Sequence, residues 1–174
     1  MGDVARGNGC DVQMNPPDGD ADLVDVVDAV LAASRVFVGI ATATLEEVAA
    51  DLTLPQFRAL AAVDARGPCS VGELAEELRV HASTATRMSR RLVAKKLVAR
   101  RSAHHDRREQ VVTLTPAGRQ LVNTVTRRRR EEIAAIVEKL PSTQRRAMVR
   151  ALRAFTRVAD AGGDHAWLAG WSVA

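Results

Sequence analysis

Residues 82–91 combine short hydroxyl side chains with guanidinium groups, a mixture that could do chemistry on nucleic acid. The polar side chains of this stretch include Ser83, Thr84, Thr86, Arg87, Arg90 and Arg91. Hydroxyl and guanidinium groups donate hydrogen bonds to the edges of bases and to phosphate oxygens. The stretch therefore predicts a surface that reads and holds DNA.

The same stretch has the period of an amphipathic helix. Ala85, Met88 and Leu92 recur at i, i+3 and i+7 and form one apolar face. We therefore expect a helix over residues 82–97 that buries this face and turns most of its hydroxyls and arginines outward. Hydroxyls near the start and arginines further along suit a helix lying in a major groove.

Positive charge is concentrated around this predicted helix. Residues 79–108 hold ten Arg or Lys and one acid, a net charge of +9, whereas the whole chain carries +4. Such a patch attracts a polyanion because binding releases counterions. An arginine-rich helix that is only solvated would carry the same charge, so charge alone does not separate the two interpretations.

The elements that must position this helix are predicted on both sides of it. Residues 98–102 and 110–114 are short runs with Val, Leu and Thr around the polar loop 103–109, which predicts a β-hairpin. Residues 70–80 predict a short helix that ends just before Ala82. Helix, short turn, helix and hairpin is the order of a winged helix-turn-helix.

Long helices are predicted outside a core at residues 53–114. Residues 22–50 carry a wide stripe of Leu and Val, and residues 115–160 contain two helices opened by Pro116 and Pro141. These helices have more apolar surface than the small core can cover. We therefore expect a mainly α protein in which the outer helices form a homodimer and space two recognition helices about one DNA turn apart.

The two ends of the chain differ from the middle in composition. Residues 1–21 are rich in Gly, Asp, Asn and Pro, which predicts a disordered acidic tail before a single domain at 22–160. Residues 161–174 form a second tail, in which the roles of Trp167 and Trp171 are not set by the sequence. No apolar run is long enough for a membrane span and no secretion signal precedes the domain, so we expect a cytoplasmic protein without a membrane partner.

Four stretches, in the correct order, resemble the MarR family of bacterial transcriptional regulators. Residues 106–115 fit the family's D-x-R, five residues, L-T pattern without gaps, and residues 83–87 resemble its S-T-x-[ST]-R pattern. LTLPQFRAL at 52–60 and LTPAGRQL at 114–121 are also typical. The resemblance implies a dimer with interlocked terminal helices, a double-stranded, pseudo-palindromic DNA operator, and repression released by a small aromatic or phenolic ligand.

The predicted wing and the end of the recognition helix carry specific expectations. Asp106 and Arg108 alternate onto one side of an extended loop, where the carboxylate can orient the guanidinium. The resemblance implies that Arg108 enters the minor groove, while Arg107 faces phosphate or solvent. A local salt bridge without a DNA role is the alternative. The chain departs from the family at Lys96, where Gly is common, so Lys96 is strained or the helix ends differently.

The sequence predicts no catalytic residues, no cofactor and no metal site. There is no Gly-rich phosphate loop and no nucleophile elbow, and His81 and His165 lie far from any metal-protease spacing. The run His104-His105-Asp106 has metal-ligand chemistry, but a solvated loop is the expected state. The chain is therefore not expected to be an enzyme.

A thiol-based redox sensor of the same fold is the alternative function. Some members of the family sense hydroperoxides through a Cys in the first helix. Here Cys10 falls in the predicted tail, and Cys69 precedes a helix N-terminus, a position that can lower the pKa of a thiol. The competing interpretation is that Cys69 is a small buried apolar residue.

Overall fold

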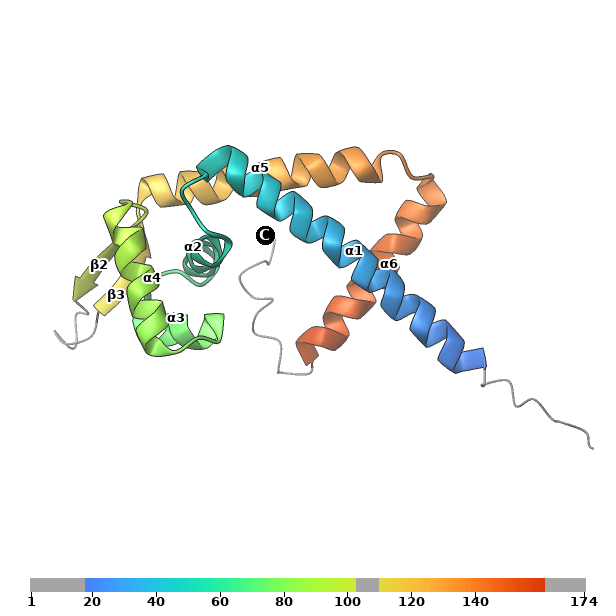
Figure 1. Cartoon of the computed structure of the whole chain (residues 1–174), viewed down its shortest axis with the longest axis horizontal. Helices are drawn as coiled ribbons and strands as arrows, with labels where there is room; N and C mark the ends of the chain where they lie inside the picture. Colours follow the sequence, from blue (N-terminus) through green and yellow to red (C-terminus); the bar gives the residue numbers. More distant parts are fainter. Residues whose placement is uncertain (1–17, 103–109, 162–174) are drawn as a thin grey trace, which may run out of the picture. The chain divides into compact units, whose positions relative to one another are not determined.

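The computed structural model describes residues 18–102 and 110–161. The elements follow one another as α1 (Asp18–Ala49), α2 (Leu54–Arg66), β1 (Cys69–Ser70), α3 (Val71–Leu78), α4 (Ala82–Ala94), β2 (Val98–Ser102), β3 (Gln110–Leu114), α5 (Pro116–Val137) and α6 (Ser142–Ala161) (Figure 1). The chain divides into two compact units, residues 1–38 and 39–174, with the boundary inside α1. The predicted fold class, mainly α with a small β-hairpin, is confirmed.

The first unit consists, among the described residues, of the N-terminal part of α1. This helix begins at Asp18, four residues inside the stretch predicted as a tail, and residues 1–17 lie outside the described part. Asp22 falls in the second turn of this helix, on the side of its N-terminus, where negative charge interacts favourably with the helix dipole. Its large apolar side chains are exposed, including Leu23, Val27 and Leu31.

The second unit is organised around one hydrophobic core. Its largest fully buried side chains come from five different elements and are Leu60, Leu74, Leu92, Val112 and Val125. They belong to α2, α3, α4, β3 and α5 in that order. Because α4 contributes its apolar face to this core, its opposite face is left toward solvent.

The short helix α3 is bounded by two clear signals. Ser70 is its N-cap: its hydroxyl accepts from the Glu73 amide at 3.1 Å, and the Glu73 carboxylate accepts from the Ser70 amide at 2.7 Å. Arg79 takes a left-handed conformation with φ 52° and ends the helix. The helix predicted over residues 70–80 is therefore shortened to Val71–Leu78 by its two caps.

The sheet has three antiparallel strands in the order β1-β3-β2. The two predicted hairpin strands are confirmed, with Val98 opposite Leu114 at one end and Ser102 opposite Gln110 at the other. The strand β1 was not predicted. It has only two residues, Cys69 opposite Val112 and Ser70 opposite Val111, too few to show an alternating pattern.

The recognition helix α4 ends at Ala94, three residues before the predicted end. Lys96 adopts φ 59°, and the Lys96 and Leu97 amides donate back to the carbonyls of Val93 (2.8 Å) and Leu92 (3.0 Å). This is the left-handed closure that Gly usually provides at the end of a helix. Lys96 therefore takes the left-handed conformation in which the resemblance leads us to expect Gly. A residue with a side chain is strained in this conformation, whereas Gly is not.

The long helix α5 begins as predicted and ends slightly early. The Thr115 hydroxyl accepts from the Gly118 amide at 3.0 Å, and Pro116 is the first helical residue. The helix ends at Val137 instead of about Lys139, and α6 then begins at Ser142, directly after Pro141.

Candidate nucleic-acid interface

Helix α4 separates an apolar face from a polar one as its periodicity predicts. Ala85 and Leu92 are buried, and Met88 packs against the core. Ser89 is also fully buried, which the sequence analysis did not anticipate; its hydroxyl donates to the Thr86 carbonyl at 3.0 Å and is thereby satisfied.

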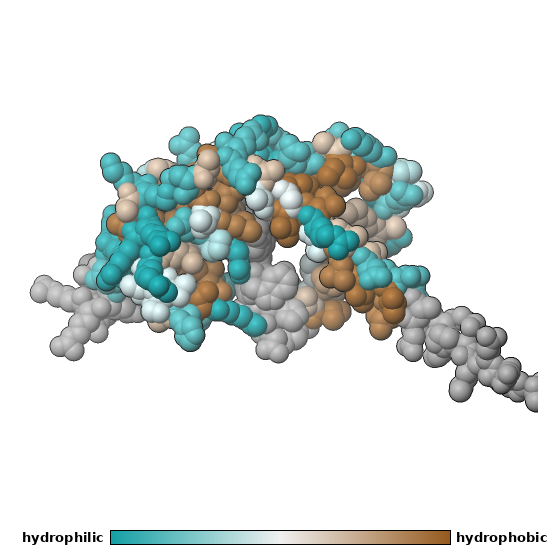
Figure 2. Space-filling model, in the orientation of Figure 1, coloured by the Kyte–Doolittle hydropathy of each residue, from teal (hydrophilic) through white to brown (hydrophobic). Residues whose placement is uncertain are grey.

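The predicted DNA-contacting side chains lie on the outer part of α4. Ser83, Arg87, Arg90 and Arg91 are exposed, whereas Thr84 and Thr86 are half-buried. Figure 2 shows strongly hydrophilic surface over this region. The structure thus brings the six predicted side chains of α4 together on one short helix.

Two of the predicted DNA-contacting side chains on α4, Thr84 and Arg87, are in contact with each other. The Arg87 Nη2 group donates to the Thr84 hydroxyl at 3.4 Å, one helical turn away. This contact limits the directions that the Arg87 guanidinium can take. A long side chain held in this way loses less conformational freedom when it binds a base edge.

A hollow of about 300 Å³ lies between α4 and the start of α2. It is lined by Thr84, Arg87, Met88 and Arg91 on one side and by Thr53, Pro55 and Gln56 on the other. The sequence analysis did not assign the residues of α2 to this surface. Their only signal was the capping-box pattern Thr53-x-x-Gln56, in which the Thr53 amide donates to Gln56 Oε1 at 3.1 Å.

The arginines on the outer face of α4 form no ion pairs with the described acidic residues. Within residues 18–102 and 110–161, no acidic side chain forms an ion pair with Arg87, Arg90 or Arg91. By contrast, Arg119 pairs with Asp64 at 3.0 Å, and Arg128 pairs with Glu47 and Glu131. Cations held in internal pairs are less available to phosphates, so the arginines of α4 without an acidic partner remain available to a polyanion.

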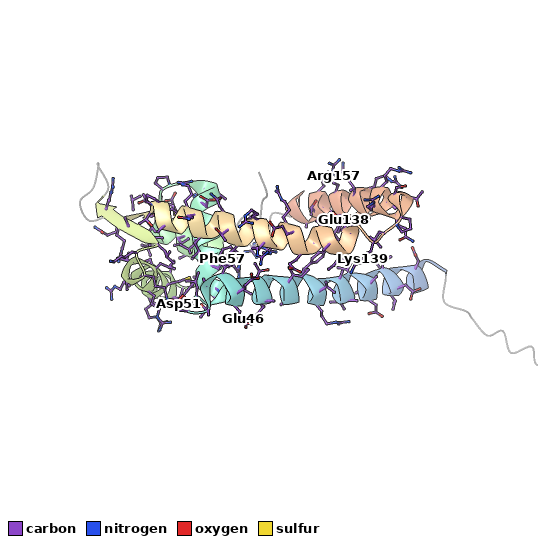
Figure 3. The ribbon with its side chains drawn as sticks, turned by 90° about the horizontal axis from the view of Figure 1, so that it is seen from above. Glu46, Asp51, Phe57, Glu138, Lys139 and Arg157 are labelled. Carbon is purple, nitrogen blue, oxygen red and sulfur yellow. The ribbon has the colours of Figure 1, made fainter. Side chains whose placement is uncertain are left out.

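Lys95 is the exception at the end of this helix. Its ammonium group forms an ion pair with Asp51, which lies just beyond α1 beside α4 (Figure 3). The hydrogen bond from Lys95 lowers the pKa of the Asp51 carboxyl below its usual value. Because Asp51 is exposed, this pair adds little to stability, but it links the end of α4 to the segment between α1 and α2.

The hairpin that carries the predicted wing follows α4 directly. Strands β2 and β3 are paired over their full length, and Arg101 on β2 is exposed. The predicted wing residues Asp106, Arg107 and Arg108 lie outside the described residues, as do His104 and His105. Their assignments therefore stay predictions.

Cys69 does not have the environment of a reactive thiol. Its side chain is 2% exposed, and burial raises its pKa, with a smaller contribution in the same direction from Glu73. The interpretation of Cys69 as a small buried apolar residue is therefore confirmed, and loss of solvation outweighs any lowering of the pKa by the start of α3. Cys10, the other candidate for redox chemistry, lies outside the described residues.

The described residues were also considered as ligands for a metal ion and as a membrane span. Among the described residues, no group of three or more His, Cys, Asp or Glu side chains could hold a metal ion. None of the described helices is long and apolar enough to cross a membrane.

A short helix, a tight turn, a basic recognition helix and a β-hairpin together define a winged helix-turn-helix DNA-binding protein. Comparison with known proteins leads to the same class. The sequence pattern of the MarR family matches residues 52–110. The HTH-type transcriptional regulator YxaD of Bacillus subtilis is 32% identical over 103 residues, which are 59% of this chain and 71% of YxaD.

Solved structures show the same similarity over a larger part of the chain. RV1404 from Mycobacterium tuberculosis is 43% identical, with a TM-score of 0.73 over 77% of this chain and 92% of RV1404. BpsR from Bordetella bronchiseptica is 30% identical, with a TM-score of 0.56 over 75% of this chain and 92% of BpsR. The chain belongs to the MarR family of DNA-binding transcriptional regulators.

Proposed function

We propose that this chain is a homodimeric repressor that binds a pseudo-palindromic DNA operator and is released from it by a small ligand. It acts in the cytoplasm, without catalysis and without a cofactor. The observation that carries this proposal is the exposed outer face of α4, where Arg87, Arg90 and Arg91 have no acidic partner among the described residues. A polyanion that binds such a face releases counterions, and this release favours the complex.

The side chains of α4 divide between reading bases and holding phosphates. Thr84 and Arg87 read base edges, because they are in contact and Arg87 can donate two hydrogen bonds to one guanine. Arg90 and Arg91 mainly bind phosphates. Ser83 and Thr86 supply further hydroxyls near the start of the helix, where the chain comes close to the DNA backbone.

The loop between β2 and β3 supplies the second DNA contact. Arg108 enters the minor groove, Arg107 meets phosphate or solvent, and Asp106 orients Arg108 by charge-assisted hydrogen bonds. The paired strands support this proposal, because β2 and β3 pair over all five residues of each strand and β2 begins shortly after the end of α4.

Exposed apolar side chains on the outer helices support dimerisation. On α6, Leu152, Phe155 and Val158 are 43%, 56% and 75% exposed, and the N-terminal part of α1 exposes Leu23 and Leu31 as well. Brown, hydrophobic surface is visible over both helices in Figure 2. Full burial of each such side chain contributes about 1.5–3 kcal/mol, so a second copy that covers them gains a large driving force.

The proposed release by a small aromatic ligand draws on one of the relatives. BpsR is described as a protein whose DNA binding is regulated by 6-hydroxynicotinic acid. At 30% identity, this chain shares enough of the fold for a ligand of the same chemical class, a small aromatic acid or phenol, to be the first to test.

The proposal is tested by selecting bound duplexes from a random pool. The expected product is an inverted repeat whose half-sites are centred about one helical turn apart, as two-fold symmetry requires. A library of aromatic acids and phenols is then screened for compounds that release the selected duplex. Enrichment of no sequence, or of a single unrepeated half-site by a protein with the mass of one chain, would contradict the proposal.

A further inference from the structure

We infer that Thr115, the N-cap of α5, is a positioning residue that sets the recognition helix α4 for specific DNA reading. The inference rests on the proposed function and adds a residue that does not itself touch DNA. It starts from the place where α4 ends, because the direction of a short helix is fixed by what holds its ends.

The end of α4 is a strained turn that requires support. Lys96 holds a left-handed backbone conformation with φ 59°, which costs a side-chain-bearing residue free energy that Gly would not pay. Only one residue, Leu97, separates it from strand β2. The carbonyls of Lys96 and Leu97 therefore sit at the junction between the recognition helix and the wing.

Thr115 holds both of these carbonyls from the start of α5. Its hydroxyl lies 2.7 Å from the Lys96 carbonyl oxygen and 3.1 Å from that of Leu97, within donating distance of each. Its amide also donates to the Leu97 carbonyl, at 3.1 Å. The hydroxyl in turn accepts from the Gly118 amide at 3.0 Å, so its oxygen is fixed by α5 itself.

The first turn of α5 also touches the Leu97 carbonyl directly. A Cβ atom added at Gly118 would lie 2.0 Å from the Leu97 carbonyl oxygen, which shows how closely the two backbones approach. Further along, Arg119 of α5 pairs with Asp64 of α2 at 3.0 Å. The end of α4 is thus attached to a helix that is itself fixed to the core, and a shift of α5 would turn the recognition helix.

Loss of the Thr115 hydroxyl should affect specific and nonspecific DNA binding differently. Binding to any duplex depends on the number of phosphates neutralised, and this number does not change when the Thr115 hydroxyl is lost. Specific binding also requires that Arg87 reach a base edge with hydrogen-bond geometry, and this does depend on the direction of α4. Loss of the hydroxyl should therefore lower the preference for the operator more than it lowers nonspecific binding.

The test compares Thr115→Val, which removes the hydroxyl at nearly constant shape, with Thr115→Ser, which keeps it. Ser70→Ala is the matched control, since it removes the equivalent N-cap of α3 and Ser70 has no hydrogen bond to α4 among the described residues. For each full-length protein we measure the affinities for a selected duplex and for its scrambled sequence, together with the urea unfolding midpoint.

We expect Thr115→Val to lower the ratio of the two affinities about tenfold, the effect of losing one intramolecular hydrogen bond. Thr115→Ser should restore the ratio, and Ser70→Ala should lower the unfolding midpoint without changing the ratio. An unchanged ratio in Thr115→Val, or an equal fall in Ser70→Ala, would overturn the inference. If the unaltered protein shows no preference for any duplex, it is the proposed function that fails.

A second pair of variants covers the case in which Thr115→Val does not fold. Lys96→Gly removes the strain of the left-handed turn, so the double variant Lys96→Gly/Thr115→Val should fold. Its affinity ratio is compared with that of Lys96→Gly alone. A tenfold lower ratio in the double variant would support the inference, and equal ratios would overturn it.

Discussion

The close approach of α5 to the end of α4 predicts a severe effect of one added methyl group. Gly118 is the third residue of α5, and its substitution by Ala would place Cβ 2.0 Å from the Leu97 carbonyl oxygen and 3.0 Å from the Leu97 carbonyl carbon. Ordinary contacts between nonbonded heavy atoms lie at about 3.5 Å. Both partners are backbone, so no side chain can rotate away, and α5 must move from Leu97 by more than about 1 Å.

The free energy of unfolding lost by Gly118→Ala follows from the contacts that this movement would break. Overpacking a close contact costs about 1–3 kcal/mol. The hydrogen bonds from Thr115 to the Leu97 carbonyl would also weaken, at about 1 kcal/mol for each one lost. Ala is favoured over Gly inside a helix by only about 0.5–1 kcal/mol. We therefore expect a net loss of about 3 kcal/mol.

Gly72→Ala is the matched control. Gly72 also lies in the first turn of a helix, α3, but a Cβ atom there would meet only the Ser70 hydroxyl oxygen at 3.7 Å, an ordinary contact. This substitution should raise the free energy of unfolding by about 0.5–1 kcal/mol. Urea unfolding followed by circular dichroism measures both variants.

Opposite signs for the two glycines are the result that the structure requires. If Gly118→Ala unfolds at the same urea concentration as the unaltered protein, the start of α5 does not press on Leu97, and the account of how α4 is held is wrong. If both substitutions destabilise equally, a general cost of changing helical glycines would explain them instead.

Three further predictions concern Lys96, the arginines of α4 and Cys69. The free energy of unfolding should be about 1 kcal/mol higher for Lys96→Gly than for Lys96→Ala, because only Gly relieves the left-handed strain. Equal free energies would show that Lys96 is not strained. In binding assays with single-base operator variants, Arg87→Ala should cost about 1–3 kcal/mol and relax the preference at one position per half-site, whereas Arg91→Ala should weaken all duplexes alike. An unchanged base preference in Arg87→Ala would show that Arg87 does not read a base. Because Cys69 is buried and its pKa is raised, its thiol should react slowly with a thiol reagent in the folded protein. DNA binding should also survive treatment with peroxide. Rapid labelling of Cys69 would support the redox alternative instead.

The sequence predicted most successfully the elements whose pattern is local. The hairpin strands followed from two short β-type runs, and the two faces of α4 followed from the spacing of Ala85 and Leu92. The helix starts predicted near Ser70 and at Pro116 are local in the same sense, since the capping hydroxyls of Ser70 and Thr115 accept from amides only three positions away. In each case the residues that decide the structure are neighbours in sequence.

The features that the sequence did not predict depend on contacts between distant residues. The resemblance pointed to a strained Lys96, but the end of α4 at Ala94 is supported by Thr115, about twenty residues later. The sequence left Cys69 open between a reactive thiol and a buried one, and its burial in a core assembled from several elements decides between them. The hollow between α2 and α4 likewise exists only once the two helices have packed together.

Specific, salt-dependent binding to one duplex tests the central claim most directly. The measurement is fluorescence anisotropy with a selected duplex and its scrambled sequence, over salt concentrations from about 50 to about 200 mM. The account predicts that the selected duplex binds about a thousandfold or more tightly than the scrambled one, and that the logarithm of each affinity falls linearly with the logarithm of the salt concentration. Equal affinities for the two duplexes, or affinities that do not change with salt, would contradict the claim that the exposed arginines of α4 bind an operator.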